Sequence, residues 1–266
     1  GGANPVWARP VYLQADGQTI HIQAGPNGSI QGPAEAKWGY TVLNVADWDH
    51  DGLQDILINS IWGKVLWYKN VGEAGKPQLA AARPIEVAWE GPTPKPAWFW
   101  WNPRGQNLVT QWRTTPLVHD LNGDGLNDLI MLDQEGYLAF FERAKNGDSL
   151  QLNPPQRIFK NEKGEALQLN EKIGGGSGRR KFVLYDWDQD GKLDLLINSK
   201  NIDFMRNIAE KDGEYQFKNE GLVDPHELAG HTTCPTIVDW DGNGVGDLLV
   251  GAEDGFFYHL PNPKQP

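Results

Sequence analysis

One short pattern occurs four times in this chain, and it restricts the possible folds more than any other feature. The copies begin at Asp47, Asp120, Asp186 and Asp239 and read DWDHDGLQDILIN, DLNGDGLNDLIML, DWDQDGKLDLLIN and DWDGNGVGDLLVG. They align without gaps, and successive first aspartates are 73, 66 and 53 residues apart. Self-similarity of this kind indicates a repeat protein in which each copy is one structural unit.

Short apolar runs flank every copy, and such runs bounded by turn residues predict β-strands. Three copies have a glycine sixteen residues after the first aspartate, which predicts a hairpin turn into a third strand rich in aromatic residues. Residues 83–87 are a candidate fourth strand, and residues 9–13 repeat their pattern. The strands predicted before and after the four motifs are 42–46 and 56–58, 117–119 and 129–132, 182–185 and 195–197, and 236–238 and 248–250.

These elements predict an all-β protein, a β-propeller built of four-stranded blades, as a single domain over residues 1–266. The last unit ends after its third strand, whereas residues 9–13 look like a fourth strand without a blade. In a propeller, such ends complement each other and hide an exposed sheet edge. We therefore expect either a closed ring of four blades or the C-terminal part of a larger propeller of seven or eight blades. The repeats are expected at about 37–110, 111–176, 177–229 and 230–266, with 1–36 supplying an outer strand.

The repeated motif is rich in ligands for calcium. Calcium prefers six to eight oxygen ligands, and alternate side chains of a tight loop point toward one centre. The glycine at position six permits the left-handed turn that closes the loop. An EF-hand is excluded because position twelve is apolar and the flanking segments are strands. The predicted ligands, at positions one, three, five and nine, are Asp47, Asp49, Asp51, Asp55, Asp120, Asn122, Asp124, Asp128, Asp186, Asp188, Asp190, Asp194, Asp239, Asp241, Asn243 and Asp247.

Composition limits the partners. The net charge is -11, which argues against nucleic acid, although 14 of the 35 acidic residues lie in the four loops. No run approaches the roughly twenty apolar residues that cross a bilayer, so no membrane insertion is expected. Cys234 is the only cysteine, which excludes an intrachain disulfide. The chain begins without Met, and we expect it to be processed, trimmed or excerpted.

The segments that lead into the first strands carry a second set of candidate residues. In a propeller these strands line the central channel, so the segments before them converge on one face. Tyr40, Arg113 and Arg179 occupy the same aligned position in three units, and His231 lies one residue earlier in the fourth. We expect them to form a pocket for an anionic molecule. The alternative is that the arginines only neutralise neighbouring carboxylates. Further candidate ligand-binding residues beside them are Lys37, Trp38, Trp112 and Arg180.

Tryptophan is the other candidate for ligand binding, because flat aromatic faces serve either cores or sugar-stacking surfaces. Trp100 and Trp101 lie in a proline-flanked insert that either packs onto the core or offers its faces to a sugar ring. Trp48, Trp187 and Trp240, at position two of three motifs, fit packing between blades better than a sugar platform.

The four loops resemble the FG-GAP or VCBS repeats of integrin-α-like and bacterial extracellular β-propellers. The resemblance is carried by the D-x-[DN]-x-[DN]-G-x-x-D motif and, more weakly, by the Gly-Ala pair at 251–252. It implies the propeller fold and calcium as the cofactor, and with them a secreted protein, extracellular or periplasmic. It does not imply an activity.

Three functions remain open at this point, and the predicted partner is an anionic glycan or a cell-surface carbohydrate. A polysaccharide lyase would use Arg113 or Arg179 to neutralise the carboxylate of a uronic acid, with Tyr40 and His231 as base and acid in a β-elimination. The resemblance makes this relevant, because several polysaccharide lyases are propellers. A lectin or adhesion module would need shallow sites lined by tryptophan in each blade. A purely structural module would need neither.

Overall fold

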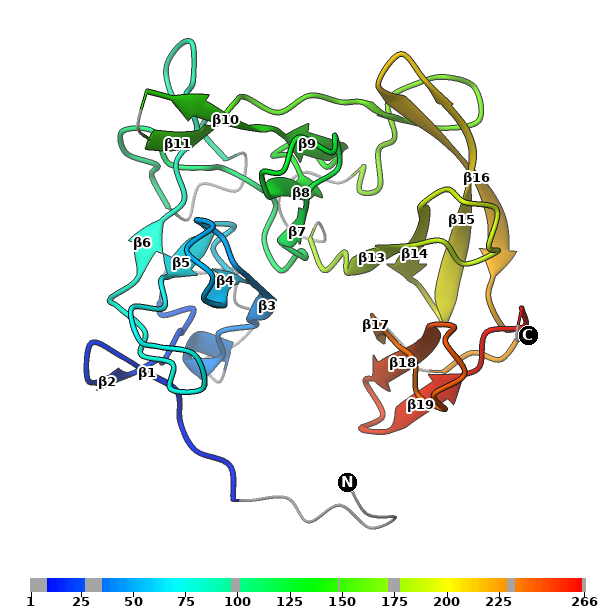
Figure 1. Cartoon of the computed structure of the whole chain (residues 1–266), viewed down its shortest axis with the longest axis horizontal. Coiled ribbons are helices and arrows are strands. Elements are labelled where there is room, and N and C mark those ends of the chain that lie inside the picture. The colour runs from blue at the N-terminus through cyan, green and yellow to red at the C-terminus, as the bar shows by residue number, and fades with distance from the viewer. Residues whose placement is uncertain are drawn as a thin grey trace.

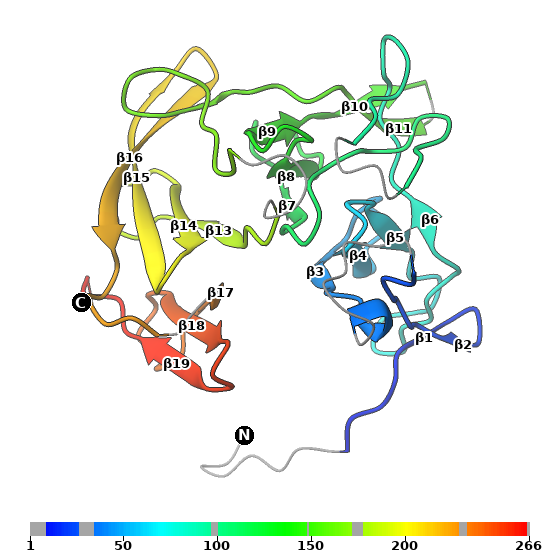
Figure 2. The same cartoon turned by 180° about the vertical axis from the view of Figure 1, so that it is seen from behind.

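A computed structural model of the chain describes residues 9–26, 35–96, 101–147, 149–171, 178–228 and 233–264. Every regular element among these residues is a β-strand, apart from one 3-10 turn, η1 (Glu35–Lys37). Four successive and mainly antiparallel sheets form an open arc, and the strand that leads into the aspartate loop of each sheet lies on the inner side of the arc (Figure 1 and Figure 2). The predicted all-β architecture of radially arranged blades is therefore confirmed. Across the described ranges, no helix has the length and apolar character needed to cross a membrane.

The first blade has all four predicted strands, because each apolar run is short and ends at a turn. β3 and β4 pair along their whole length, so the first aspartate loop is the connection between them. The other strands follow in sequence order, each pairing with the one before it. Their bounds are β3 (Val42–Ala46), β4 (Asp55–Asn59), β5 (Leu66–Tyr68) and β6 (Arg83–Pro84).

The second blade is a three-stranded sheet of β7 (Leu117–His119), β8 (Asp128–Leu132) and β9 (Leu138–Phe141). All residues of β8 and β9 are buried, as expected for strands covered on both faces by neighbouring blades. A separate hairpin follows, made of β10 (Arg143–Asn146) and β11 (Ser149–Leu152). Its end lies against the segment after β6, because Leu152 forms a parallel bridge with Val87 of the first blade's insert.

The third blade is the largest, and the fourth has three strands in the part of the chain that is described. The third sheet contains one parallel pair, in which the short strand β12 lies along the outer strand β16. The third blade comprises β12 (Phe159–Lys160), β13 (Phe182–Tyr185), β14 (Asp194–Asn198), β15 (Ile202–Lys211) and β16 (Glu214–Leu222), and the fourth comprises β17 (Thr233–Val238), β18 (Asp247–Ala252) and β19 (Phe257–Leu260).

The N-terminal segment does not behave as predicted. Residues 9–13 form no strand, and the chain instead makes a small hairpin of β1 (Gln14–Ala15) and β2 (Gln18–Thr19). Ala15 bridges Leu79 and packs with it in a small apolar cluster of the first blade. This docking draws the segment to one end of the arc, while β19 lies at the other end and pairs only with β18 within the described residues (Figure 1). Closure of a four-bladed ring by strand exchange between the two ends is therefore not observed.

Apolar cores between consecutive blades hold the arc together. Trp48 of the first motif is 3% exposed and packs in a cluster that includes Leu129 and Phe141 of the second blade. Trp187 is 4% exposed and packs against β18 residues of the fourth blade. Trp240, at the same motif position in the fourth blade, is 62% exposed. Position two of the motif thus supplies an inter-blade contact wherever a following blade is present.

We expect Trp48→Ala to lower the free energy of unfolding by about 3–5 kcal/mol, because it removes a large buried side chain from the core between two blades. Trp240→Ala is the matched control and is expected to cost less than about 1 kcal/mol, because most of its side chain is exposed. Urea unfolding of the two variants tests this. Equal losses of stability would show that Trp48 does not hold the blades together.

Candidate functional site

Each aspartate loop is closed by its first aspartate, whose carboxylate accepts backbone hydrogen bonds from across the turn. Asp47 Oδ1 accepts from the amide of Asp51 at 3.0 Å, and Asp47 Oδ2 accepts from the amide of Gly52 at 2.9 Å. The bond to the position-six glycine recurs in the other three loops at 2.9–3.0 Å. All four glycines have φ between 85° and 89°, a left-handed conformation that disfavours residues with a Cβ. The loop shape therefore follows directly from the motif.

The aspartate at position nine connects the loop to the end of the third strand. In the first blade, Asp55 is fully buried, and its Oδ1 accepts from the amide of Asn70 at 2.6 Å while its Oδ2 accepts from the amide of Trp48 at 3.2 Å. The same bond recurs at 2.8 Å in each remaining blade, from Arg143 and Asn262 beyond the third strand and from Asn207 within it. One carboxylate thus joins three segments in each of the first three blades, because the amide of position two also binds it there.

The residue whose backbone amide binds position nine also contributes its side chain to this junction in three blades, and the sequence pattern did not reveal it. The side-chain amides of Asn70, Asn207 and Asn262 donate to the carbonyl of position eight at 3.1–3.3 Å. In the second blade the equivalent residue is Arg143, whose amide binds Asp128 in the same way. A signal was present, because this residue follows position nine by fifteen residues in three blades, but the third copy shortens the interval to thirteen.

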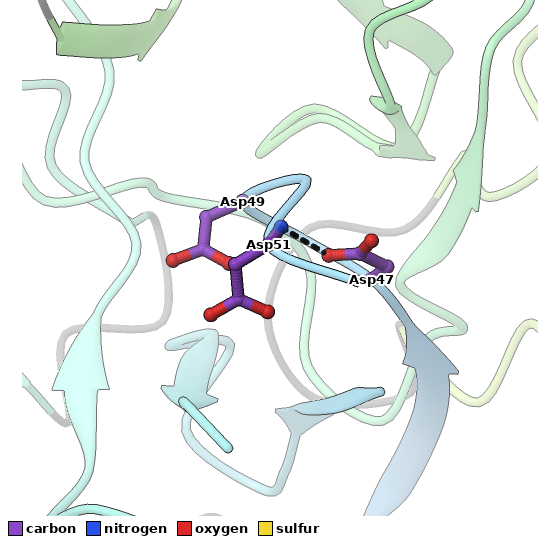
Figure 3. A group of neighbouring side chains, drawn as sticks. All are labelled: Asp47, Asp49 and Asp51. Carbon is purple, nitrogen blue, oxygen red and sulfur yellow. Dashed lines mark hydrogen bonds between the residues drawn. The ribbon is translucent and has the colours of Figure 1, made fainter. Parts of the chain in front are cut away.

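The predicted ligand side chains lie together in two of the four loops. Single carboxylate oxygens of Asp47, Asp49 and Asp51 lie within 4.8 Å of one another, and the three side chains surround the turn (Figure 3). Asp186, Asp188 and Asp194 form an equivalent group. Asp49 Oδ1 is buried without a hydrogen-bond partner, as a free metal ligand would be. These all-oxygen groups fit calcium better than zinc or copper.

Side-chain cations occupy the same two loops. Lys69 Nζ forms ion pairs with Asp49 and Asp51, the latter at 2.8 Å. In the third loop, Arg206 contacts Asp188 at 2.7 Å and Lys192 contacts Asp190 at 2.7 Å. The second loop differs, because none of its three carboxylates forms an ion pair with any residue that the structure describes. Loops one and three are thus partly neutralised by the protein itself, and a metal ion would compete with these cations.

Burial changes the pKa of the position-nine carboxylates. Burial raises the pKa of Asp128 to about 6. Hydrogen bonds from two backbone amides oppose this increase, and the charges of Asp124 and Asp120 add to it. Burial also raises the pKa of Asp194 to about 6, with a further contribution from the charge of Asp188. Their ionised forms are therefore destabilised in the fold unless a cation lies nearby.

The segments that lead into the first strands, which we call the inner end of the blades, carry the predicted residues Tyr40, Arg113 and Arg179. Tyr40, Arg113 and Arg179 have φ of 49°, 57° and 64°, so all three adopt the same left-handed conformation at the same position of three units. Backbone hydrogen bonds tie two of them to the preceding blade: the amide of Arg113 donates to Ser60 O at 2.8 Å, and that of Arg179 donates to Trp112 O at 3.3 Å. Left-handed conformations are unusual for such residues, and they often mark functional sites.

Arg113 is the most enclosed cation of this region. It is 5% exposed, and its guanidinium carbon lies 3.3 Å from the centroid of the Tyr40 ring. The Tyr40 hydroxyl donates to Glu35 Oε1 at 2.6 Å. Burial lowers the pKa of Arg113 to about 10, whereas the charges of Tyr40 and Glu35 oppose this change. Arg113 Nε has no hydrogen-bond partner and no carboxylate lies at ion-pair distance from this side chain within the described ranges.

Arg179 and Lys181 lie close enough to Arg113 for their charges to interact, and Arg180 lies between these two residues in the sequence. We refer to Arg113, Arg179, Arg180 and Lys181 as the inner cationic cluster. Burial lowers the pKa of Lys181; nearby Cys234 opposes this effect, and the positive charges of Arg113 and Arg179 reinforce it. Burial also lowers the pKa of Arg180, whose guanidinium donates to Asn198 O at 3.3 Å. The structure thus brings Arg113 into contact with Tyr40, and the charge of Arg179 is close enough to lower the pKa of Arg113.

The remaining predicted ligand-binding residues have different environments. Trp38 is 50% exposed and lies edge-on to Tyr40, with ring centroids 5.7 Å apart, and Lys37 is exposed beside it. Trp112 was predicted to bind ligand but is 2% exposed and packs with Ala24 and Ile61, so its indole is part of the core. Trp101 is partly buried. Trp100 and His231 lie outside the described residues.

The repeated sheets and their aspartate loops define a propeller-like repeat protein. Comparison with known families identifies the repeat: residues 120–197 and 186–250 match the model described as an FG-GAP-like repeat. These segments contain the second, third and fourth aspartate loops. This part of the chain therefore contains FG-GAP-like repeats, as the resemblance in its loops implied.

Comparisons with curated proteins and with solved structures give less information about this chain. A search of curated proteins found no match. Among solved structures, the chain is similar to a lectin from Agrocybe aegerita, described for its specific recognition of non-reducing terminal N-acetylglucosamine, with 18% sequence identity and a TM-score of 0.44. The alignment covers 85% of this chain and 50% of the lectin chain, so this chain spans about half the length of that protein.

We expect the calcium-free protein to become less stable as the pH rises from about 4 to 7. The folded pKa values of Asp128 and Asp194 lie above those of exposed carboxyls, so the folded state binds more protons than the unfolded state in this window. In chelator, the melting temperature should therefore be higher at pH 5 than at pH 7. Asp128→Asn combined with Asp194→Asn should flatten this dependence, whereas exposed Asp212→Asn should leave it unchanged. A melting temperature that rises with pH in chelator would contradict the assignment.

Proposed function

We propose that this chain is a calcium-stabilised binding module that takes an acidic glycan at its inner cationic cluster. The observation that carries the proposal is Arg113, a guanidinium 5% exposed whose Nε has no partner among the described residues. A buried cation without a carboxylate partner is costly to keep. An anion bound beside Arg113 would offset this cost and use the free donor.

The charge distribution supports an anionic ligand. The chain carries a net charge of -11, yet the charges of Arg113, Arg179 and Lys181 act on one another at the segments that lead into the first strands. The planar fork of arginine matches the two oxygens of a carboxylate or sulfate group. The half-exposed Trp38 beside Tyr40 offers a flat apolar face next to these cations. A sugar ring that bears an acidic group would use both features at once.

The environment of Tyr40 favours binding over catalysis by β-elimination. A tyrosine base must lose its proton readily, but burial and the hydrogen bond to Glu35 raise the pKa of Tyr40, an effect that the charge of Arg113 only partly opposes. The hydroxyl also already donates to Glu35, and Arg113 covers the ring. We therefore propose recognition as the primary function of this site, with elimination as an outcome that the binding experiment also detects.

Calcium has a separate, structural role in this proposal. The residues that would hold it are the aspartates and asparagines at positions one, three, five and nine of the loops. A bound ion would supply positive charge to the buried position-nine carboxylates. The loops follow the first strands, whereas Tyr40 and Arg113 precede them, so the ions lie at the opposite ends of these strands from the glycan. Because loops one and three already contain cations, we propose weak sites suited to calcium outside the cell.

Arg113→Met should weaken binding to an acidic polysaccharide such as polygalacturonate by about tenfold or more, because it removes a charged hydrogen-bond donor. Trp38→Ala, at a half-exposed position, should weaken it without affecting the fold. Lys163→Ala, an exposed cation elsewhere, is the control. Binding to immobilised polygalacturonate and to neutral dextran measures the effect, and ultraviolet absorbance detects an unsaturated product. Equal binding of both polysaccharides, or unchanged binding after both substitutions, would refute the proposed site.

Calcium should raise the melting temperature, and one site filled at a concentration of 100 times its Kd should add about 2.7 kcal/mol of stability. Asp186→Asn should reduce this calcium-dependent gain because it removes a ligand charge from the third loop. Exposed Asp212→Asn should not. Terbium luminescence excited through Trp187, which lies between two ligand positions, reports occupancy of this loop directly. No response to calcium or terbium by either method would exclude the loops as metal sites.

A further inference from the structure

A cavity lies between the first and second blades, and none of its lining residues belongs to the inner cationic cluster. Its volume is about 560 Å³, within the range of pockets that hold small organic ligands. Two segments form its sides: residues 83–88 after the third strand of the first blade, and β11 of the hairpin that follows the second. A hydrogen bond of 2.8 Å from the amide of Ala88 to Leu152 O holds these segments together. The cavity is thus a fixed feature of the seam between two blades.

The lining has an apolar base and a polar rim. Trp48, Val87 and Leu152 are buried and face the cavity together with the partly buried Trp67. Arg83, Glu86 and Gln106 are exposed at its edge. Such a combination suits a ring that presents apolar faces to the base and oxygen atoms to the rim.

Arg143 supplies the charge in the base of this cavity. It is 5% exposed, its guanidinium carbon lies 3.8 Å from the centroid of the Trp48 ring, and one of its nitrogens donates to Trp48 O at 2.5 Å. Its Nε has no hydrogen-bond partner, and no carboxylate within the described ranges lies at ion-pair distance from it. A fixed guanidinium with a spare donor faces a cavity large enough for a ligand.

Comparison of the four blades indicates that Arg143 does more than stabilise the fold. The other three blades place Asn70, Asn207 or Asn262 at this position, and each amide satisfies the carbonyl of position eight. The second blade lacks this contact and has an arginine beside the cavity instead. Stacking on Trp48 alone would account for a cation at this position but not for the open space in front of it.

We propose that this cavity binds a small ring compound bearing a carboxylate, of the chemical class of a uronic acid. Arg143 would bind the carboxylate, Trp67 and Trp48 would contact the ring, and the rim would bind its hydroxyl groups. Among the residues that line the cavity, Arg83 and Arg143 outnumber the single carboxylate of Glu86, which favours an anion. The carboxylates of Asp49, Asp128 and Asp55 are close enough to raise the pKa of Arg143 but do not line the cavity. This site uses none of the residues of the inner cationic cluster. The proposal therefore does not depend on whether that cluster binds a ligand.

The test is titration of the whole 15N-labelled chain, at fixed calcium, with glucuronate and with glucose, its neutral counterpart. Two-dimensional NMR follows the indole resonances, and loss of one peak in Trp67→Phe assigns that of Trp67. Calorimetry measures the affinity. We expect glucuronate to shift the Trp67 resonance and glucose to bind at least about tenfold more weakly, because only glucuronate uses the charged donor.

Two variants separate recognition from folding. Arg143→Met should weaken glucuronate binding about tenfold or more, and exposed Arg83→Glu should weaken it about threefold without disturbing the buried seam. Arg113→Met should leave the Trp67 response unchanged, which distinguishes this cavity from the inner cluster. No shift of the Trp67 resonance, equal binding of glucose, or full binding by Arg83→Glu would each overturn the proposal.

Discussion

Each blade depends on a buried carboxylate at position nine of its motif. This side chain accepts a hydrogen bond from one backbone amide within or just beyond the third strand in all four blades, and from the amide of position two of the loop in the first three. Unpaired backbone amides in a buried turn are costly, and a single carboxylate satisfies two of them. The cost is the burial of a negative charge, visible in the raised pKa values of Asp55, Asp128 and Asp194. A nearby cation, from the protein or from solution, offsets this cost.

The first strands separate two regions of opposite charge. The aspartate loops follow these strands and contain most of the clustered carboxylates, whereas the inner cationic cluster precedes them. This separation keeps cations in a chain of net charge -11 apart from the carboxylates of the loops. The proposed metal sites and the proposed anion site would therefore not compete for the same side chains.

The motif determined most of what could be predicted. Its glycines, aspartates and flanking apolar runs define local geometry, and the strands at 42–46, 117–119 and 182–185 lie where the pattern indicated. Alignment of the units also indicated that Tyr40 and Arg113 would meet. Features that depend on packing between distant segments could not be predicted from the sequence. Residues 9–13 have the pattern of a strand, yet Ala15 docks on Leu79 and no sheet edge reaches them. Trp112 looked available for a ligand, but tertiary contacts bury it.

Departures from the repeat are more informative about function than the repeat itself. Positions that serve the fold hold the same chemistry in each blade, because each blade solves the same packing problem. A tyrosine in one unit and arginines in two others at one left-handed position cannot be explained by that shared requirement, since all three adopt the same backbone conformation. The same reasoning applies to Arg143, which replaces an asparagine whose contact the other blades retain. Both departures place a nine-tenths buried guanidinium with an unpartnered Nε at the seam between two consecutive blades. Such seams are where a repeat protein can vary side chains without altering the strands that support them.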